Sequence, residues 1–208
     1  MLASNQQALL LLCIYAPQTA ARELFNSLGL QYSNLKFRLS YAWGNLLLSF
    51  FQGAQGLMAL VILPLITRAL ATPLGWSPWM RDRRYTITSI GVMASGLLVI
   101  ASAPLLALEV IGLLLVSLGS CTNGLLMSLM GGAVPADAVG AIYSAALTLS
   151  IIARSISGPI FNGLFITSMK LGWIWLGLPF AAMAAFMLCQ FAASFFIRKD
   201  RAEDAGDH

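Results

Sequence analysis

Six long apolar segments make up almost the whole chain, and they decide which solvent the protein folds in. They run over residues 7–30, 43–70, 86–104, 106–131, 138–168 and 173–197, with short polar or Pro- and Gly-containing breaks between them. A helix needs about 20 mainly apolar residues to cross the roughly 30 Å hydrocarbon core of a bilayer. Barrel strands would alternate in polarity, and these segments do not. We therefore expect an all-α integral membrane protein, with six transmembrane helices over 1–197 and a charged cytoplasmic tail over 198–208.

Charged residues are too few to cover a surface that faces water. They make up 10% of the chain and hydrophobic residues 59%, whereas soluble domains have roughly 25% and 45–50%. The expected partner is the lipid bilayer, and no nucleic acid is expected. The three cysteines lie within apolar runs without paired spacing, which indicates neither a disulfide nor a metal site. We expect no cofactor.

The distribution of basic residues predicts how the chain is oriented. Six spans place both termini on one side of the membrane, which carries seven basic residues: Arg68, Arg81, Arg83, Arg84, Arg198, Lys199 and Arg201. The other side carries three: Lys36, Arg38 and Lys170. Because cytoplasmic loops are enriched in Lys and Arg, we expect both termini in the cytoplasm. The sequence does not distinguish the plasma membrane from the vacuolar membrane.

Arg154 lies in the middle of the fifth apolar segment, ALTLSIIARSISGPIFNGLF. An arginine at the bilayer centre costs about 2.5–3.5 kcal/mol, so it is expected to face the bundle interior or a water-filled cavity. Helical spacing places small and polar residues on the same face: Ser150, Ser157, Gly158 and Asn162. Arg154 then has either a substrate, gating or coupling role, or a structural ion pair with Glu23 or Glu109. Four residues after it, Gly158 and Pro159 predict a helix kink that serves gating.

Three other segments carry polar or small stripes. The first contains Gln18, Arg22 and Asn26 with Glu23 beside them, the second Gln52 and Gln55, and the fourth Asn123 beside Ser117, Ser120, Gly124 and Ser128. The Ser and Gly residues favour helix packing. Arg22 and Glu23 either face the interior or extend to the outer interface. The two glutamines either form hydrogen bonds between helices or contact a solute.

The chain resembles the C-terminal half of a major facilitator superfamily transporter, of the type abundant in filamentous fungi. The stretches that carry the resemblance are LQYSNLKFRLS at 30–40, RDRRYTITS at 81–89 and VGAIYSAALTLSIIARSISGP at 139–159. Their order and spacing along six spans match helices seven to twelve. The resemblance identifies Arg81, Asp82, Arg83 and Arg84 as the cytoplasmic linker between the second and third spans.

The resemblance also implies transport of a small solute by alternating access, with the solute between two six-helix halves. The implied cavity-lining residues are Gln18, Arg22, Asn26, Gln52, Gln55, Asn123 and Arg154, and Glu23 is the implied proton-coupling residue. The N-terminal half would come from the same gene, a partner chain or a homodimer. The alternative is a non-transporting half-transporter relic or a membrane interaction partner.

An enzyme is not expected. Intramembrane hydrolases need an activated nucleophile, paired aspartates or a metal. The single histidine, His208, is in the tail, and all aspartates lie outside the apolar segments. A channel is not indicated either, because the sequence contains no ring-forming charged segment and no filter-like loop.

Overall fold

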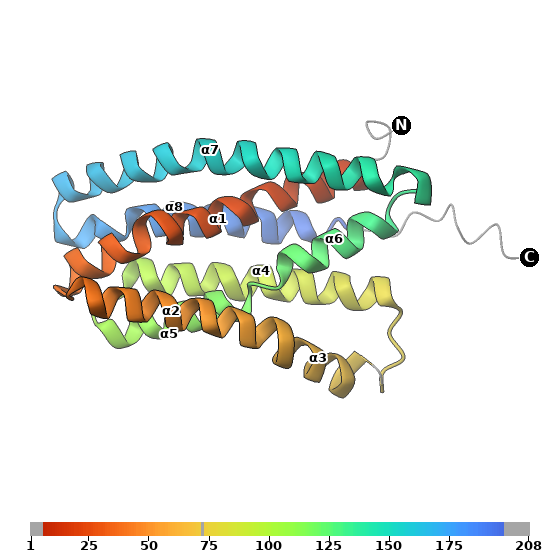
Figure 1. Ribbon diagram of the computed structural model, residues 1–208, viewed down its shortest axis with the longest axis horizontal. Helices are drawn as coiled ribbons and strands as arrows, with labels where there is room; N and C mark the ends of the chain where they lie inside the picture. The colour runs from red at the N-terminus through yellow and green to blue at the C-terminus, as the bar shows by residue number, and fades with distance from the viewer. Residues whose placement is uncertain (1–5, 72, 198–208) are drawn as a thin grey trace, which may run out of the picture.

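The computed structural model describes residues 6–71 and 73–197, and over these residues the chain is almost entirely helical without strands. The main helices, in chain order, are α1 (Gln6–Phe37), α2 (Tyr41–Leu57), α3 (Leu63–Ile66), α4 (Pro78–Ser102), α5 (Leu106–Leu118), α6 (Thr122–Gly132), α7 (Val139–Leu171) and α8 (Leu178–Ser194). The helices run along one common long axis, as Figure 1 shows. The predicted all-α class is confirmed, and the protein is a multi-pass integral membrane protein.

Five helical stretches of the described chain are long and apolar enough to cross a membrane: Tyr41–Ala69, Pro78–Ser102, Leu106–Gly132, Ala136–Leu171 and Trp173–Ser194. Helix α1, which contains the predicted segment 7–30, is 32 residues long but is not among them. The reason is its polar stripe, which lowers its mean hydropathy. The count of six spans therefore stays a prediction.

Two predicted segments are interrupted. The segment 43–70 passes from α2 through the π-helical turn Met58–Ile62 into α3, which has Pro64 in its first turn. The segment 106–131 is divided into α5 and α6 by a turn at residues 119–121. Non-helical backbone at membrane depth is tolerated only where protein or a water-filled cavity covers it. We therefore expect the α5–α6 turn to face the protein interior or a water-filled cavity.

Helices α4 and α5 cross in very close contact. A Cβ atom built on Gly96 would lie 2.8 Å from both the Gly112 carbonyl oxygen and the Val116 backbone nitrogen. Small residues permit such backbone approaches between membrane helices. Helix α4 also packs extensively against α8, and α1 packs mainly against α7.

The buried apolar side chains form two separate clusters, one toward each end of the bundle. The first cluster, toward the end where α1 finishes at Phe37, includes Leu28, Leu97 and Phe180. The second, toward the end where α1 begins, includes Leu11, Ile90 and Leu129. We call these two ends the Phe37 end and the Gln6 end; they lie at the left and right of Figure 1. On α1, Gln18 lies between Tyr15 of the second cluster and Ala20 of the first.

Candidate functional site

A polar pocket lies between the two apolar clusters. Its lining comes from α1, α2, α4, α5, the α5–α6 turn and α6: Gln18, Arg22, Phe25, Phe51, Gln55, Met93, Val116, Ser120 and Asn123. The pocket has a volume of about 20 Å³. Four of the cavity residues expected from the sequence thus meet at one place, although they come from three different helices.

Gln18 is held in place by a residue that the sequence analysis missed. Its Nε2 atom donates to Gln190 Oε1 at 3.2 Å, and Gln190 Nε2 in turn donates to the Ile14 carbonyl oxygen at 2.9 Å. Both glutamine side chains are buried. The pair joins α1 to α8 at pocket depth, so the Gln18 amide nitrogen serves packing even though the residue lines the pocket. No residue near Gln190 in the sequence signals this role, because its partner is in the first helix.

Asn123 is in the first turn of α6, directly after the α5–α6 turn. Its Oδ1 atom is buried and has no hydrogen-bond partner among the described residues. A buried polar atom without a partner costs about 1–3 kcal/mol, so this oxygen is suited to accept a hydrogen bond from a bound molecule. The first backbone N–H groups of a helix also lack partners within the helix. The α5–α6 turn therefore places the unpaired Asn123 oxygen at the pocket.

Arg22 supplies the positive charge of the pocket. Its side chain is exposed, and within the described part of the chain it forms no ion pair. A guanidinium has five N–H donors in a planar arrangement that matches carboxylate and phosphate groups. Together with Gln55, it gives the pocket a surplus of donors on the side of α1 and α2.

The other expected cavity residues do not reach the pocket. Gln52 on α2 and Arg154 on α7 are exposed and are not part of its lining. On the face expected to be shared with Arg154, Ser150 and Ser157 are buried, whereas Asn162 is exposed. Arg154 thus sits on the border of the packed face of α7. The Asn26 side chain lies outside the described residues.

The two expected ion-pair partners of Arg154 have other contacts. Glu23 is half-buried and accepts a hydrogen bond from Ser27 Oγ at 3.1 Å. Glu109 accepts one from Ser33 Oγ. Over residues 6–71 and 73–197, the structure contains a single ion pair, which joins Arg81 and Asp82. An Arg154 ion pair with either glutamate is therefore absent.

Helix α7 continues without a break through Gly158 and Pro159, from Val139 to Leu171. Pro159 removes one backbone N–H, yet the turns on both sides remain helical. The Asn162 side chain donates to the Gly158 carbonyl oxygen at 2.9 Å, beside the proline. A gating role for this pair stays a prediction.

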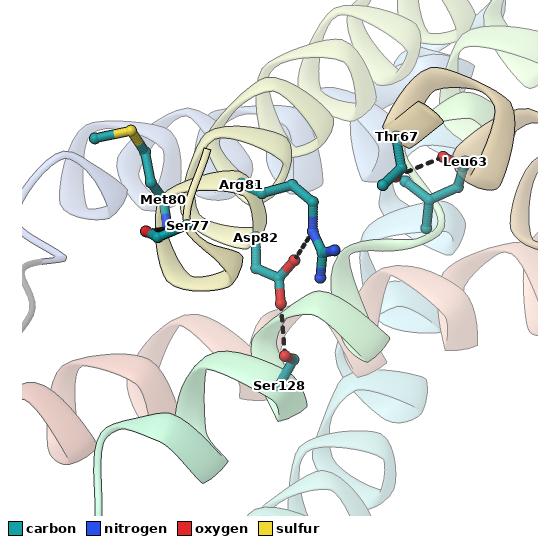
Figure 2. Close-up of polar contacts among 7 residues, drawn as sticks. All are labelled: Leu63, Thr67, Ser77, Met80, Arg81, Asp82 and Ser128. Atoms are coloured by element: carbon teal, nitrogen blue, oxygen red, sulfur yellow. Dashed lines mark hydrogen bonds and ion pairs between the residues drawn. The ribbon is translucent and has the colours of Figure 1, made fainter. Parts of the chain in front are cut away.

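The expected cytoplasmic linker lies in the first turns of α4. The helix begins early because Ser77 caps it, with Ser77 Oγ accepting from the Met80 N–H, and because Pro78 suits the first helical position. Figure 2 shows Asp82 between Arg81 and Ser128. Arg81 Nε lies 2.7 Å from Asp82 Oδ1, and Ser128 Oγ donates to Asp82 Oδ2 at 2.6 Å. Asp82 therefore ties α4 to α6 at the Gln6 end.

Two neighbours of Asp82 extend this junction. Arg83 donates to the Phe195 carbonyl oxygen just after α8, at 3.1 Å. The Arg84 guanidinium lies over the Trp76 ring, 4.4 Å from its centre, a favourable cation–π geometry. The basic-acidic segment is thus a structural junction of α4, α6 and the end of α8.

A helical membrane bundle with a polar pocket at mid-depth is typical of proteins that handle solutes. The comparisons with known proteins agree with this class. The chain is 29% identical over 173 residues to the MFS-type transporter avaK of Aspergillus versicolor, a match that covers 83% of this chain and 38% of the relative. It is 27% identical over 154 residues to the MFS efflux pump atnC of Emericella nidulans, covering 73% of this chain and 30% of the relative.

The chain is therefore a relative of fungal major facilitator superfamily transporters, and the resemblance expected from the sequence is confirmed. The matched region spans about a third of the length of these curated relatives. No family model and no solved structure matches the chain.

Proposed function

We propose that this chain forms one half of a membrane transporter and moves a small organic anion by alternating access. The observation that carries the proposal is the pocket at mid-depth, where Arg22, Gln55 and Asn123 present polar groups between two apolar clusters. Solutes of such transporters bind near the bilayer midplane, between two halves. Arg22 suits an anionic group, and the free Asn123 oxygen suits a hydrogen-bond donor on the same solute. No catalytic group is proposed.

A second half would cover α2 and α7. Only 11% of the residues in the Tyr41–Ala69 window and 17% of those in the Ala136–Leu171 window are buried, compared with 44–50% for the other three spans. These two helices also carry Gln52 and Arg154 in exposed positions. Because polar side chains in membrane helices face protein or water rather than lipid, these faces support a protein partner. The partner is an N-terminal half encoded with this chain, a separate protein or a second copy.

Export is the direction that we propose, because one relative is named an efflux pump. In the proposed orientation, the Gln6 end and both termini face the cytoplasm. A plasma or a vacuolar membrane would serve equally.

If Glu23 couples proton movement to transport, Glu23→Gln removes the dependence of transport on a pH gradient while the protein still folds. Unchanged pH-gradient dependence in that variant would exclude the role.

The pocket is tested with Arg22→Met in cells that export a panel of fluorescent organic anions. We expect export to fall about tenfold or more, since a hydrogen bond to a charged group contributes about 1.5–3 kcal/mol. Lys170→Met is the matched control, because Lys170 is an exposed basic residue at the end of α7, outside the pocket. Equal export by both variants would place the solute elsewhere. If no member of the panel is exported by the unaltered chain, the non-transporting alternative is favoured.

The partner face is tested by cysteine cross-linking in native membranes, after the three native cysteines are replaced by serine. We expect Gln52→Cys and Arg154→Cys to cross-link to a second polypeptide whose mass identifies it as a copy or another protein. Phe186→Cys is the control, since Phe186 is exposed on the better-buried α8 span. Cross-linking that is equal at all three positions, or absent at the first two, contradicts a partner on α2 and α7.

A further inference from the structure

Glu109 is the most deeply buried glutamate of the described chain, with 2% of its surface exposed. It lies in the first turn of α5 at the Phe37 end and is not part of the lining of the polar pocket. From the sequence, Glu109 was named as a structural ion-pair partner for Arg154. An ionisable residue inside a membrane helix is costly and marks a functional site unless its charge is paired.

One carboxyl oxygen of Glu109 has a partner and the other has none. Ser33 Oγ of α1 donates to Glu109 Oε1 at 2.6 Å. Glu109 Oε2 is buried without a hydrogen-bond partner in the part of the chain that the structure describes. A single neutral hydroxyl does not compensate a buried negative charge, which costs several kcal/mol when unpaired.

The nearest basic side chain, that of Lys36, makes its hydrogen bond to another residue, although its charge still acts on Glu109. Lys36, also buried, donates from Nζ to the Tyr32 hydroxyl at 2.6 Å, and that hydroxyl donates to the Ile100 carbonyl oxygen at 2.6 Å. Lys36 and Tyr32 are the titratable groups that face Glu109 from α1. The residues of α2, α4, α5 and α8 that line the adjoining pocket carry no titratable side chain apart from Glu109: Gly44, Leu47, Leu48, Phe51, Ile100, Leu113 and Phe180.

That adjoining pocket has a volume of about 20 Å³, sufficient for one water-sized molecule. Such a molecule would lie beside the carboxyl group and could pass a proton to or from it. Apart from Glu109 and Ser33, no residue of the lining has a polar side chain, so the pocket offers no cation that would stabilise a carboxylate.

We propose that Glu109 is a proton-binding site that fastens α5 to α1 at the Phe37 end. In the packed arrangement the carboxyl group is neutral: Oε1 accepts from Ser33 and Oε2 carries the proton. Release of that proton to water leaves a carboxylate, which needs water or the Lys36 ammonium as a new partner. One water in the adjoining pocket does not compensate the charge, and further water or a hydrogen bond to Lys36 requires α5 to move relative to α1. Proton binding and the closure of this end therefore stabilise each other.

The site itself is independent of transport, whereas a role in driving transport rests on the proposed function. Infrared spectroscopy of the purified chain in detergent separates the two, because it measures the carboxyl group directly. A protonated carboxyl group has a carbonyl stretching band that solvent-exposed acids lose at neutral pH. We expect this band at neutral pH in the unaltered chain, its loss in Glu109→Gln, and its retention in the matched variant Glu23→Gln.

Two further variants keep the test decisive if Glu109→Gln does not fold. Ser33→Ala removes the hydrogen bond to Oε1, so the band should move to higher frequency without disappearing. Lys36→Met removes a nearby positive charge that favours the carboxylate, so the neutral carboxyl group and its band should be retained. A band that is absent from the unaltered chain, or that appears only after Lys36→Met, would show that Glu109 is ionised and would overturn the proposal. A band without anion export would retain the proton site and reject the transport function.

Discussion

Gly96→Val is expected to destabilise the bundle by about 3 kcal/mol, the upper part of the range for overpacked interiors. The added atoms would meet the backbone of α5, with the Gly112 oxygen and the Val116 nitrogen both 2.8 Å from the new Cβ. Backbone atoms cannot rotate away as a flexible side chain can. Helices α4 and α5 would have to separate along their crossing, which loosens the first apolar cluster that includes Leu97 and Leu113. Thermal unfolding in detergent, followed by circular dichroism, measures the loss.

The matched control for this change is Gly163→Val. Gly163 is in the middle of α7, and a Cβ atom there would meet nothing within 4 Å. Both variants change helix propensity in the same way, but only Gly96→Val brings new side-chain atoms against a neighbouring helix. A loss of stability in Gly163→Val as large as that in Gly96→Val would mean that propensity, rather than the α4–α5 crossing, controls the result.

The second large effect is expected from Asp82→Ala, which should cost about 2–3 kcal/mol because it removes a charged hydrogen-bonding partner from a nearly buried position. Asp82 is 3% exposed and accepts from both Arg81 and Ser128. Its loss would release α6 from α4 at the Gln6 end. Ser128→Ala removes only one of the two contacts, so we expect a smaller loss of about 1 kcal/mol. The same thermal unfolding measurement compares both variants.

Asp137→Ala serves as the control, since Asp137 is an exposed aspartate in the short turn before α7. We expect its unfolding temperature to match that of the unaltered chain. If Asp82→Ala behaves like Asp137→Ala, the Asp82 contacts contribute nothing to stability, and other contacts must hold α4 against α6.

The apolar runs were sufficient to predict helices and the membrane, because hydrocarbon leaves the backbone few alternatives. The transporter class was predicted only from the resemblance of three stretches to a known family. The helical stripe on the first segment also placed Gln18 and Arg22 on one face, and both line the pocket. Helical periodicity could not show which polar stripes of different helices face one another. Gln55 and Asn123 reach that pocket whereas Gln52 does not, since the rotation of each helix is set by its neighbours.

Two features, the α5–α6 turn and the burial of Glu109, could not be predicted from the sequence for specific physical reasons. The residues Gly119, Ser120 and Cys121 are small and uncharged, so they read as part of a packing seam rather than as a helix break. Glu109 was expected from the sequence as an ion-pair partner of Arg154. The structure covers it instead with residues from α1, α2 and α8 that are distant in sequence. Burial by residues that are distant in the sequence cannot be predicted from local composition.

The division of the interior into two apolar clusters has a mechanical consequence. With one continuous core, a bundle that opened at one end would disturb side-chain packing along its whole length. Here the layer of Gln18, Asn123 and their neighbours separates the packing at the Phe37 end from that at the Gln6 end. Each end can then loosen while the side-chain packing at the other end is retained.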